Sequence, residues 1–263
     1  MNVRNIVIGS VCALFLMTES AWATTPDSEV IGQFSKQQKG NIEKIVHDYL
    51  VEHPEVLIEA SRVLQVRQHK QMLASASENI LKNAPQLFDS KNSVVGNPKG
   101  QVTIVEFFDY QCGHCKNMSP VISALIQKNK DLRVVLKQFP IFGESSEYAA
   151  KAVLASQKQG KFQVFHEALM KTEEKLSQKE VLAIAKSQGL NLVKLEQDLK
   201  DPAVIKELDD NMKLAKALHL SGTPAFVVGS TPAGLFKAGK PNILLPGEVS
   251  EAELQKLIEQ LKS

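Results

Sequence analysis

Residues 102–115 read VTIVEFFDYQCGHC, an apolar run that leads directly into two cysteines separated by Gly113 and His114. A dense apolar run of this length is typical of a buried strand. From Cys112 to about Asn129 the apolar side chains recur at offsets of three and four, which predicts a helix. The cysteine pair is therefore expected where a buried strand passes into the first turn of a helix.

This position suits redox chemistry. The first turn of a helix has unpaired N–H groups and a partial positive charge, which stabilise a thiolate at Cys112. His114 can add positive charge or a hydrogen-bond donor. We therefore expect Cys112 to be the exposed nucleophile that exchanges with a substrate disulfide. Cys115, one turn later and more buried, would resolve the mixed disulfide.

Two other uses of a C-x-x-C pair fit this chain less well. A structural zinc site needs four ligands, and no second cysteine pair is present. Covalent haem needs a histidine directly after the second cysteine, where Lys116 stands. We expect no metal and no cofactor.

The first 23 residues indicate export. A basic Arg4 precedes an apolar run from Ile6 to Met17, and Ala21-Trp22-Ala23 suits a signal peptidase. The run is about half of the ~20 apolar residues that a membrane span needs, so a cleaved signal over residues 1–23 is favoured over an anchor. Cleavage leaves Cys112 and Cys115 as the only cysteines, and a single pair in an oxidising compartment favours a chemical role.

Downstream of the cysteines, the pattern alternates between strands and helices. Residues 133–139 suit a second strand, residues 145–220 a mostly helical insert, residues 225–228 and 242–245 two late strands, and residues 251–261 a closing helix. This order predicts an α/β fold with a partly parallel sheet.

The pattern over residues 24–90 predicts an almost entirely helical segment with one apolar face. The residues of this face recur at helical spacing: Ile42, Ile45, Val46, Tyr49, Leu50, Val56, Leu57, Ala60, Val63 and Leu64. Such a stripe must be buried on another surface. We expect self-association into a homodimer or homotrimer, and the alternative is packing on the chain's own domain. The formal net charge of +2 gives no case for nucleic acid.

Two motifs resemble one known family. Residues 106–115, EFFDYQCGHC, resemble the active-site strand and helix start of the DsbA family of periplasmic thiol–disulfide oxidoreductases. Residues 222–226, GTPAF, resemble its cis-proline loop, and residues 53–57, HPEVL, are similar to extensions in a dimeric or trimeric subgroup. The resemblance implies a thioredoxin fold with a helical insertion, as a catalytic domain over residues 91–263, preceded by an α-helical oligomerisation segment over residues 24–90.

The resemblance also implies roles for the residues around a redox-active disulfide of Cys112 and Cys115. Pro224, if cis, would bring the backbone of Thr223 beside Cys112, where it could pair with an extended substrate segment.

An acidic residue completes the implied site. Glu106 matches a buried acidic position beneath the cysteines and could accept the proton of Cys115, with Lys137 as a candidate partner. The other histidines, His166 among them, are expected on surfaces or helix faces rather than as ligands.

Two departures from the family pattern favour a milder oxidant. Gly113-His114 stands where strongly oxidising members carry Pro-His, and Thr223 stands where the oxidase prototype has Val. Both are usual in protein disulfide isomerases. We therefore expect a periplasmic enzyme that forms or isomerises disulfides in unfolded or misfolded exported proteins, with a membrane redox partner of DsbB or DsbD type. A pure disulfide oxidase, an exported chaperone and a copper-binding protein using the two thiolates remain alternatives.

Overall fold

The computed structural model describes residues 34–88, 93–173, 175–237, 239 and 241–262. The signal predicted over residues 1–23 lies outside the described residues. Contacts divide the chain into two compact units, residues 1–62 and 63–263. The division falls inside a helix, well before the boundary near residue 90 that the sequence suggests.

The N-terminal segment is helical, as predicted. Helix α1, Lys36–Glu52, begins at Ser35, whose hydroxyl accepts from the backbone of Gln38 while the Gln38 side chain accepts from the backbone of Ser35. The helix is interrupted at Pro54, and helix α2 then runs over Glu55–Lys82. No residue of α1 is buried.

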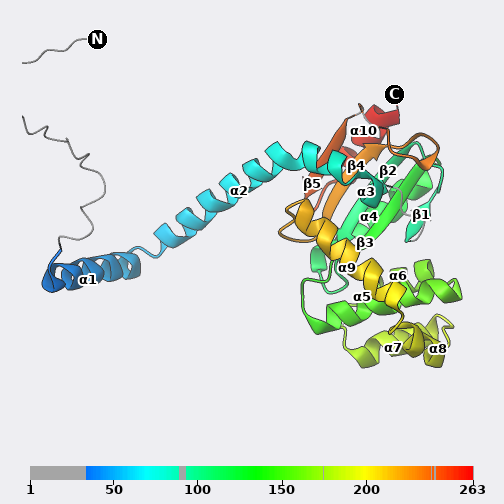
Figure 1. Cartoon of the computed structure of the whole chain (residues 1–263), viewed down its shortest axis with the longest axis horizontal. Helices are drawn as coiled ribbons and strands as arrows, with labels where there is room; N and C mark the ends of the chain where they lie inside the picture. The colour runs from blue at the N-terminus through cyan, green and yellow to red at the C-terminus, as the bar shows by residue number, and fades with distance from the viewer. Residues whose placement is uncertain (1–33, 89–92, 174, 238, 240, 263) are drawn as a thin grey trace, which may run out of the picture. The chain divides into compact units, whose positions relative to one another are not determined.

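A five-stranded mixed sheet forms the centre of the second unit (Figure 1). Its strands are β1 Val94–Gly96, β2 Val102–Phe108, β3 Leu132–Gln138, β4 Ala225–Ser230 and β5 Asn242–Pro246. Their order is β1-β3-β2-β4-β5, with β2 and β3 parallel and the other neighbours antiparallel. The predicted partly parallel sheet is confirmed, and it contains one short strand, β1, that the sequence pattern did not predict.

Helices cover both faces of the sheet, and the alternation of side chains along β2 divides them between two cores. Val102, Ile104 and Phe108 join the core that contains α4, Gly113–Lys128, and α10, Glu251–Lys262. Val105 and Phe107 join the other core.

The second core explains where the compact unit begins. It contains α9, Pro202–Ala217, and α3, Ala84–Phe88, together with Ala76 and Ile80 from the C-terminal part of α2. Because these α2 side chains are buried against the sheet unit, that part of the helix belongs to it rather than to a separate stalk.

The predicted helical insert lies between β3 and β4. It consists of α5 Glu144–Ser156, α6 Phe162–Lys171, α7 Gln178–Ser187, α8 Leu192–Asp198 and α9, with a 3-10 turn at Gln157–Gln159. Helices α5 to α8 lie together beside one end of the sheet (Figure 1). Among the helices that the structure describes, none is long and apolar enough to cross a bilayer.

Candidate active site

The two cysteines lie where β2 gives way to α4. Cys112 is the N-cap residue of α4, with extended backbone angles, and Cys115 lies in the first turn. Both are free thiols. Cys115 is completely buried and Cys112 is 3% exposed, so both residues of the pair are buried. The expectation of an exposed Cys112 is wrong, because the loop before β4 lies over its sulfur.

That loop is the predicted cis-proline loop. The peptide bond between Thr223 and Pro224 is cis, and the Cys112 Sγ donates to the carbonyl oxygen of Thr223 at 3.3 Å. The pairing of β4 with β2 causes this approach, since Ala225 lies opposite Phe107 near the cysteine end of β2. The structure therefore brings Thr223 and Pro224 beside Cys112, as the resemblance implies.

Glu106 is buried in the middle of the sheet. It lies on β2 between Leu136 of β3 and Phe226 of β4, on the sheet face that α4 covers. Burial raises the pKa of its carboxyl to about 8, and its Oε1 has no hydrogen-bond partner. The predicted burial of Glu106 is confirmed.

The thiol of Cys115 is also shifted by its surroundings. Burial raises its pKa well above the ordinary range for a thiol, and the neighbouring Cys112 acts in the same direction, although a hydrogen bond with the backbone of Asp109 opposes them. Cys115 therefore holds its proton strongly while the pair is reduced.

Lys137 is not the partner of Glu106. In the β2–β3 register Lys137 lies opposite Phe107, whereas Glu106 lies opposite Leu136. Side chains alternate between the faces of a sheet, so the ammonium and the carboxyl lie on opposite faces. Burial lowers the pKa of Lys137, and Glu207 and Asp210 of α9 oppose this shift.

His114 contacts an acidic residue that the sequence gave no reason to expect. Its Nδ1 lies 3.0 Å from Oε1 of Glu248, and the Asn117 amide donates to the same oxygen at 2.9 Å. Hydrogen bonds from Asn117 and His114 lower the pKa of Glu248. His114 itself is largely exposed, with 71% of its side chain accessible.

Asp109 organises the loops around the cysteines. Its Oδ1 accepts from the backbone N–H of Gln111 and the hydroxyl of Ser146, both at 2.7 Å. Its Oδ2 accepts from the backbone N–H groups of Ile141 and Phe142, at 2.8 and 3.1 Å. One buried carboxylate thus ties the cysteine loop to the loop after β3. The polar residue at the end of an apolar strand was the available signal for this role.

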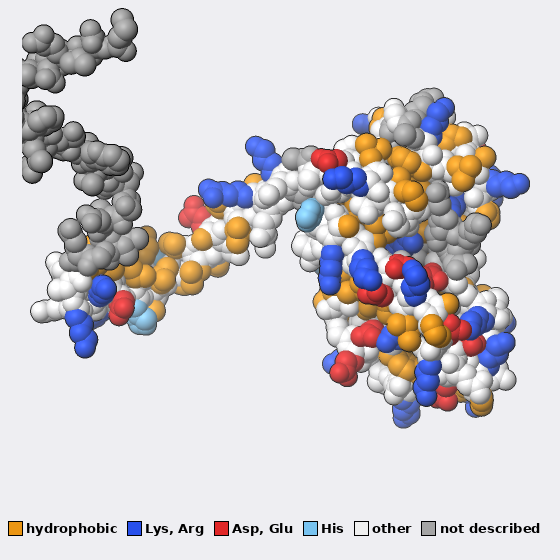
Figure 2. All heavy atoms as spheres, in the orientation of Figure 1, with side chains coloured by type: hydrophobic (Ala, Val, Ile, Leu, Met, Phe, Trp, Pro, Cys, Tyr) orange, Lys and Arg blue, Asp and Glu red, His pale blue; other side chains and the backbone are white. Residues whose placement is uncertain are grey.

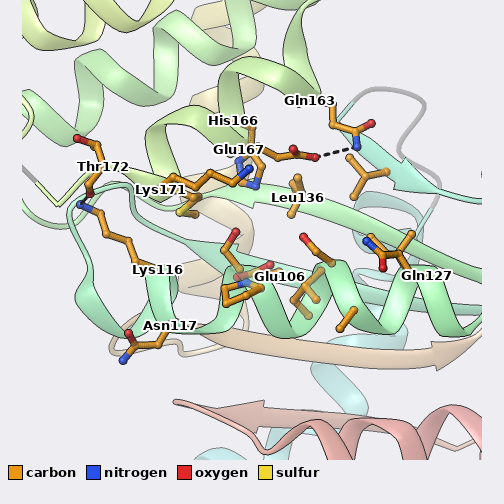
Figure 3. A pocket seen from close by; sticks show the side chains of 18 of the residues that line it. Glu106, Lys116, Asn117, Gln127, Leu136, Gln163, His166, Glu167, Lys171 and Thr172 are labelled. Carbon is orange, nitrogen blue, oxygen red and sulfur yellow. Dashed lines mark hydrogen bonds between the residues drawn. The ribbon is translucent and has the colours of Figure 1, made fainter.

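A groove of about 910 Å³ opens between α4 and α6, with Glu106 and Leu136 on its inner wall (Figure 3). At one end of the groove the ammonium of Lys116 donates to the carbonyl oxygen of Thr172 at 2.7 Å. The groove places a buried carboxyl group within reach of solvent from the side of α4.

His166 lines the same groove from α6 and is buried, so of the two expected positions it takes the helix face and not the surface. Its Nδ1 lies 3.0 Å from the hydroxyl of Tyr110, and its ring contacts Phe108 and Phe162. Burial lowers its pKa to about 4, so the imidazole is neutral near pH 7. Phe162 lies one turn earlier on α6, whereas Phe108 and Tyr110 come from a distant segment that sequence spacing did not connect with His166.

Two family models match the chain. Residues 103–259 match the DSBA-like thioredoxin domain, and residues 38–71 match the copper resistance protein ScsC N-terminal domain. The second match covers most of α1 and part of α2.

Solved structures with similar folds include oxidoreductases. A thioredoxin-like oxidoreductase from Silicibacter pomeroyi is 38% identical, with a TM-score of 0.61, over 67% of this chain and 96% of its own. BcfH from Salmonella enterica Typhimurium is 31% identical, with a TM-score of 0.64, over 86% and 97%. ScsC from Proteus mirabilis, in a transitional conformation, is 27% identical, with a TM-score of 0.61, over 87% and 99%.

Curated relatives match over part of their length. The thiol:disulfide interchange protein DsbA of Bordetella pertussis is 30% identical over 138 residues, which are 49% of this chain and 64% of that protein. The Na(+)/H(+) antiporter NhaA 3 of Salinispora tropica is 26% identical over 171 residues, 64% of this chain. The match spans only 26% of the antiporter's length.

Proposed function

The chain belongs to the DsbA-like thioredoxin family, and from that premise we propose that it exchanges disulfides with exported proteins through Cys112 and Cys115. The observation that carries this proposal is the position of the Cys112 sulfur. It lies at the N-cap of α4, 3.3 Å from the backbone of Thr223, with Cys115 one turn further along the helix.

The oxidative reaction proceeds in two exchanges. A client thiolate attacks the Cys112 sulfur of the enzyme disulfide, the bond to Cys115 breaks, and its electron pair leaves on Cys115, which takes up a proton. A second client thiolate then attacks the mixed disulfide and releases Cys112. The client loses two electrons and two protons, and the enzyme gains both.

Glu106 handles the proton of Cys115 in this proposal. Its pKa of about 8 leaves the carboxyl mostly protonated at neutral pH, so it can donate a proton when the disulfide opens, and its ionised form can accept one when Cys115 attacks. The groove between α4 and α6 supports this role, because Glu106 lies on its wall and can exchange protons with water there.

Isomerisation uses the same sulfur without net electron transfer. The Cys112 thiolate attacks a wrong client disulfide, a different client thiol resolves the mixed disulfide, and the enzyme leaves as a dithiol. Gly113 and Thr223 favour an isomerase or mixed activity over a pure oxidase. A membrane redox partner of DsbB type would reoxidise the pair, and one of DsbD type would keep it reduced.

We also propose that the N-terminal segment joins copies of the chain in the periplasm. Apolar side chains lie exposed along the first unit, and Figure 2 shows hydrophobic atoms along α1 and the start of α2. The exposed residues are Ile42, Ile45, Val46, Tyr49, Val51, Leu57 and Ile58. These residues all lie within the stretch 38–71 that matches the ScsC N-terminal domain, and we expect them to join two or three copies of the chain in a homodimer or homotrimer.

Substitution of each cysteine tests the enzyme proposal. Cys112→Ser should lower insulin reduction and the reactivation of scrambled ribonuclease to background, because it removes the attacking sulfur. Cys115→Ser should instead accumulate mixed disulfides with clients on nonreducing gels. Circular dichroism of each variant checks the fold, and full activity of Cys112→Ser contradicts the proposal.

The same variants and assays distinguish the enzyme from the other candidate functions, a chaperone, a copper-binding protein and a pure oxidase. A chaperone would still suppress client aggregation when both cysteines are serine. A copper-binding protein would take up one Cu(I) per reduced pair tightly and show no exchange activity. Faster oxidation of reduced ribonuclease without reactivation of the scrambled form would identify a pure oxidase.

A further inference from the structure

The start of α4 holds a carboxylate beside the cysteines. Nδ1 of His114 and the amide of Asn117 both contact Oε1 of Glu248, at 3.0 and 2.9 Å. The other nearby cation, Lys116, donates to the carbonyl of Thr172. His114 and Lys116 of this turn therefore each have an oxygen partner other than the Cys112 sulfur.

Glu248 reaches this turn because its loop is held against the cis-proline loop. The backbone N–H of Gly247 donates to the carbonyl oxygen of Pro224 at 2.8 Å. Gly247 has a φ of +81°, a conformation that glycine adopts without strain. The turn after β5 thus directs the next residue, Glu248, towards α4, where Asn117 fixes its carboxylate.

A carboxylate at this position opposes a thiolate on Cys112. The thiolate is stabilised by the positive end of α4, and a second negative charge at the same helix end repels it. Glu248 also occupies the imidazole nitrogen that could otherwise donate to the sulfur. Whether His114 is protonated or neutral, removal of the negative charge of Glu248 makes the net charge of this turn more positive by one elementary charge.

We propose that Glu248 is a positioning residue that lowers the oxidising strength of the Cys112–Cys115 pair by holding His114 and by placing a negative charge at the start of α4. The inference rests on the proposed thiol–disulfide exchange. A thiolate occurs only in the reduced enzyme, so a group that disfavours it shifts the equilibrium towards the disulfide form and makes that form a weaker donor.

Equilibration of the purified protein with glutathione measures this effect. One enzyme dithiol and one glutathione disulfide give one enzyme disulfide and two glutathione thiols. Glu248→Gln, which keeps the shape and removes the charge, should shift this equilibrium about two- to five-fold towards the dithiol, the range of an exposed ion pair. Alkylation of Cys112 by iodoacetamide near pH 7 should accelerate by a similar factor, and added salt should reduce the difference.

A matched variant controls for the loss of any nearby carboxylate. Glu251→Gln removes a carboxylate that lies shortly after Glu248 in the chain, at the start of α10, but Glu251 pairs with Lys128 at the far end of α4. It should leave the glutathione equilibrium unchanged. In a His114→Gln background, Glu248→Gln should have a smaller effect than in the wild type.

Each outcome decides between the two proposals. If the wild type interconverts between dithiol and disulfide but Glu248→Gln behaves like Glu251→Gln, or shifts towards the disulfide, the role of Glu248 is refuted and the exchange activity stands. If the wild type forms no disulfide with glutathione at any ratio, the proposed function itself fails.

Discussion

At the scale of single residues, the site depends on groups that are buried without a neutralising partner. Glu106 lies beneath the active-site helix with one carboxyl oxygen unpaired, and burial raises the pKa of this carboxyl. Cys115 is a buried thiol whose pKa is raised as well. Both groups hold a proton in the reduced protein at pH 7, so Glu106 must release its own proton before it can accept that of Cys115.

Glu106 should make the stability of the protein depend on pH. Its pKa rises from 4.5 to about 8 on folding, so between these values the folded state binds more protons than the unfolded state. The contribution of Glu106 to the free energy of unfolding is then greatest below about pH 4.5 and falls as the pH rises towards 8. The total loss is a few kcal/mol, on the order of the pKa shift. Urea denaturation of the reduced protein at pH 5 and pH 8 measures the loss.

Glu106→Gln should remove most of this difference, since the amide does not titrate. Glu253→Gln, an exposed carboxylate on α10, serves as the control and should retain the wild-type pH dependence. If the free energy of unfolding depended on pH in the same way in the wild type and in Glu106→Gln, the prediction would be wrong, and the carboxyl would be ionised inside the fold. Activity of the variant should also fall where proton transfer from Cys115 limits the rate.

At the scale of elements, one side chain joins segments that are distant in the chain. Asp109 receives backbone N–H groups from the cysteine loop and from the loop after β3, and a hydroxyl from α5. The exposed apolar side chains of Ile141 and Phe142 are carried by the second of these loops. Their backbone is fixed relative to Cys112 through this carboxylate.

Asp109→Asn should destabilise the protein by about 2–3 kcal/mol, because an amide presents N–H donors to the backbone donors that the carboxylate satisfies. Urea denaturation measures the change. Asp131→Asn, at an exposed position before β3, is the matched control and should stay within about 0.5 kcal/mol of the wild type. Equal stability of the two variants would mean that Asp109 is not the link between the loops.

The elements themselves were largely predictable, and the contacts between them were not. The cysteines at a strand–helix junction, the helical insert and the late strands followed from apolar periodicity and from local motifs. Glu248 and His166 did not, because their partners lie on other elements and become neighbours only on folding. The proposed pairing of Lys137 with Glu106 failed because the register between two strands decides which faces their side chains share.

At the scale of the whole molecule, the two compact units have different surfaces. The second unit buries its apolar side chains in two cores, whereas α1 buries none. An apolar helix surface without a core of its own is typical of a segment that associates with another copy. The sequence predicted this segment, but its end at about residue 90 lies beyond side chains that belong to the sheet unit.

Ile45→Lys should weaken self-association, because it places a charge on the exposed apolar face of α1. Light scattering should show a multiple of the monomer mass for the wild type and a shift towards the monomer for the variant. His47→Lys, which adds the same side chain at another exposed position of α1, is the control and should leave the mass unchanged. A wild-type monomer at micromolar concentration contradicts the proposal and weakens the case for an isomerase.

The opposite orientations of Glu106 and Lys137 have a wider consequence. Glu106 and Lys137 are both buried and lie on neighbouring strands, but they do not form an ion pair. The backbone of the sheet separates the two side chains, which point to opposite faces. Protons can therefore be exchanged at Glu106 on the side of the cysteines, whereas Lys137 on the other face interacts with Glu207, Asp210 and Arg133. The two faces of the β2–β3 pair therefore present separate electrostatic environments, one around the carboxyl of Glu106 and one around the ammonium of Lys137.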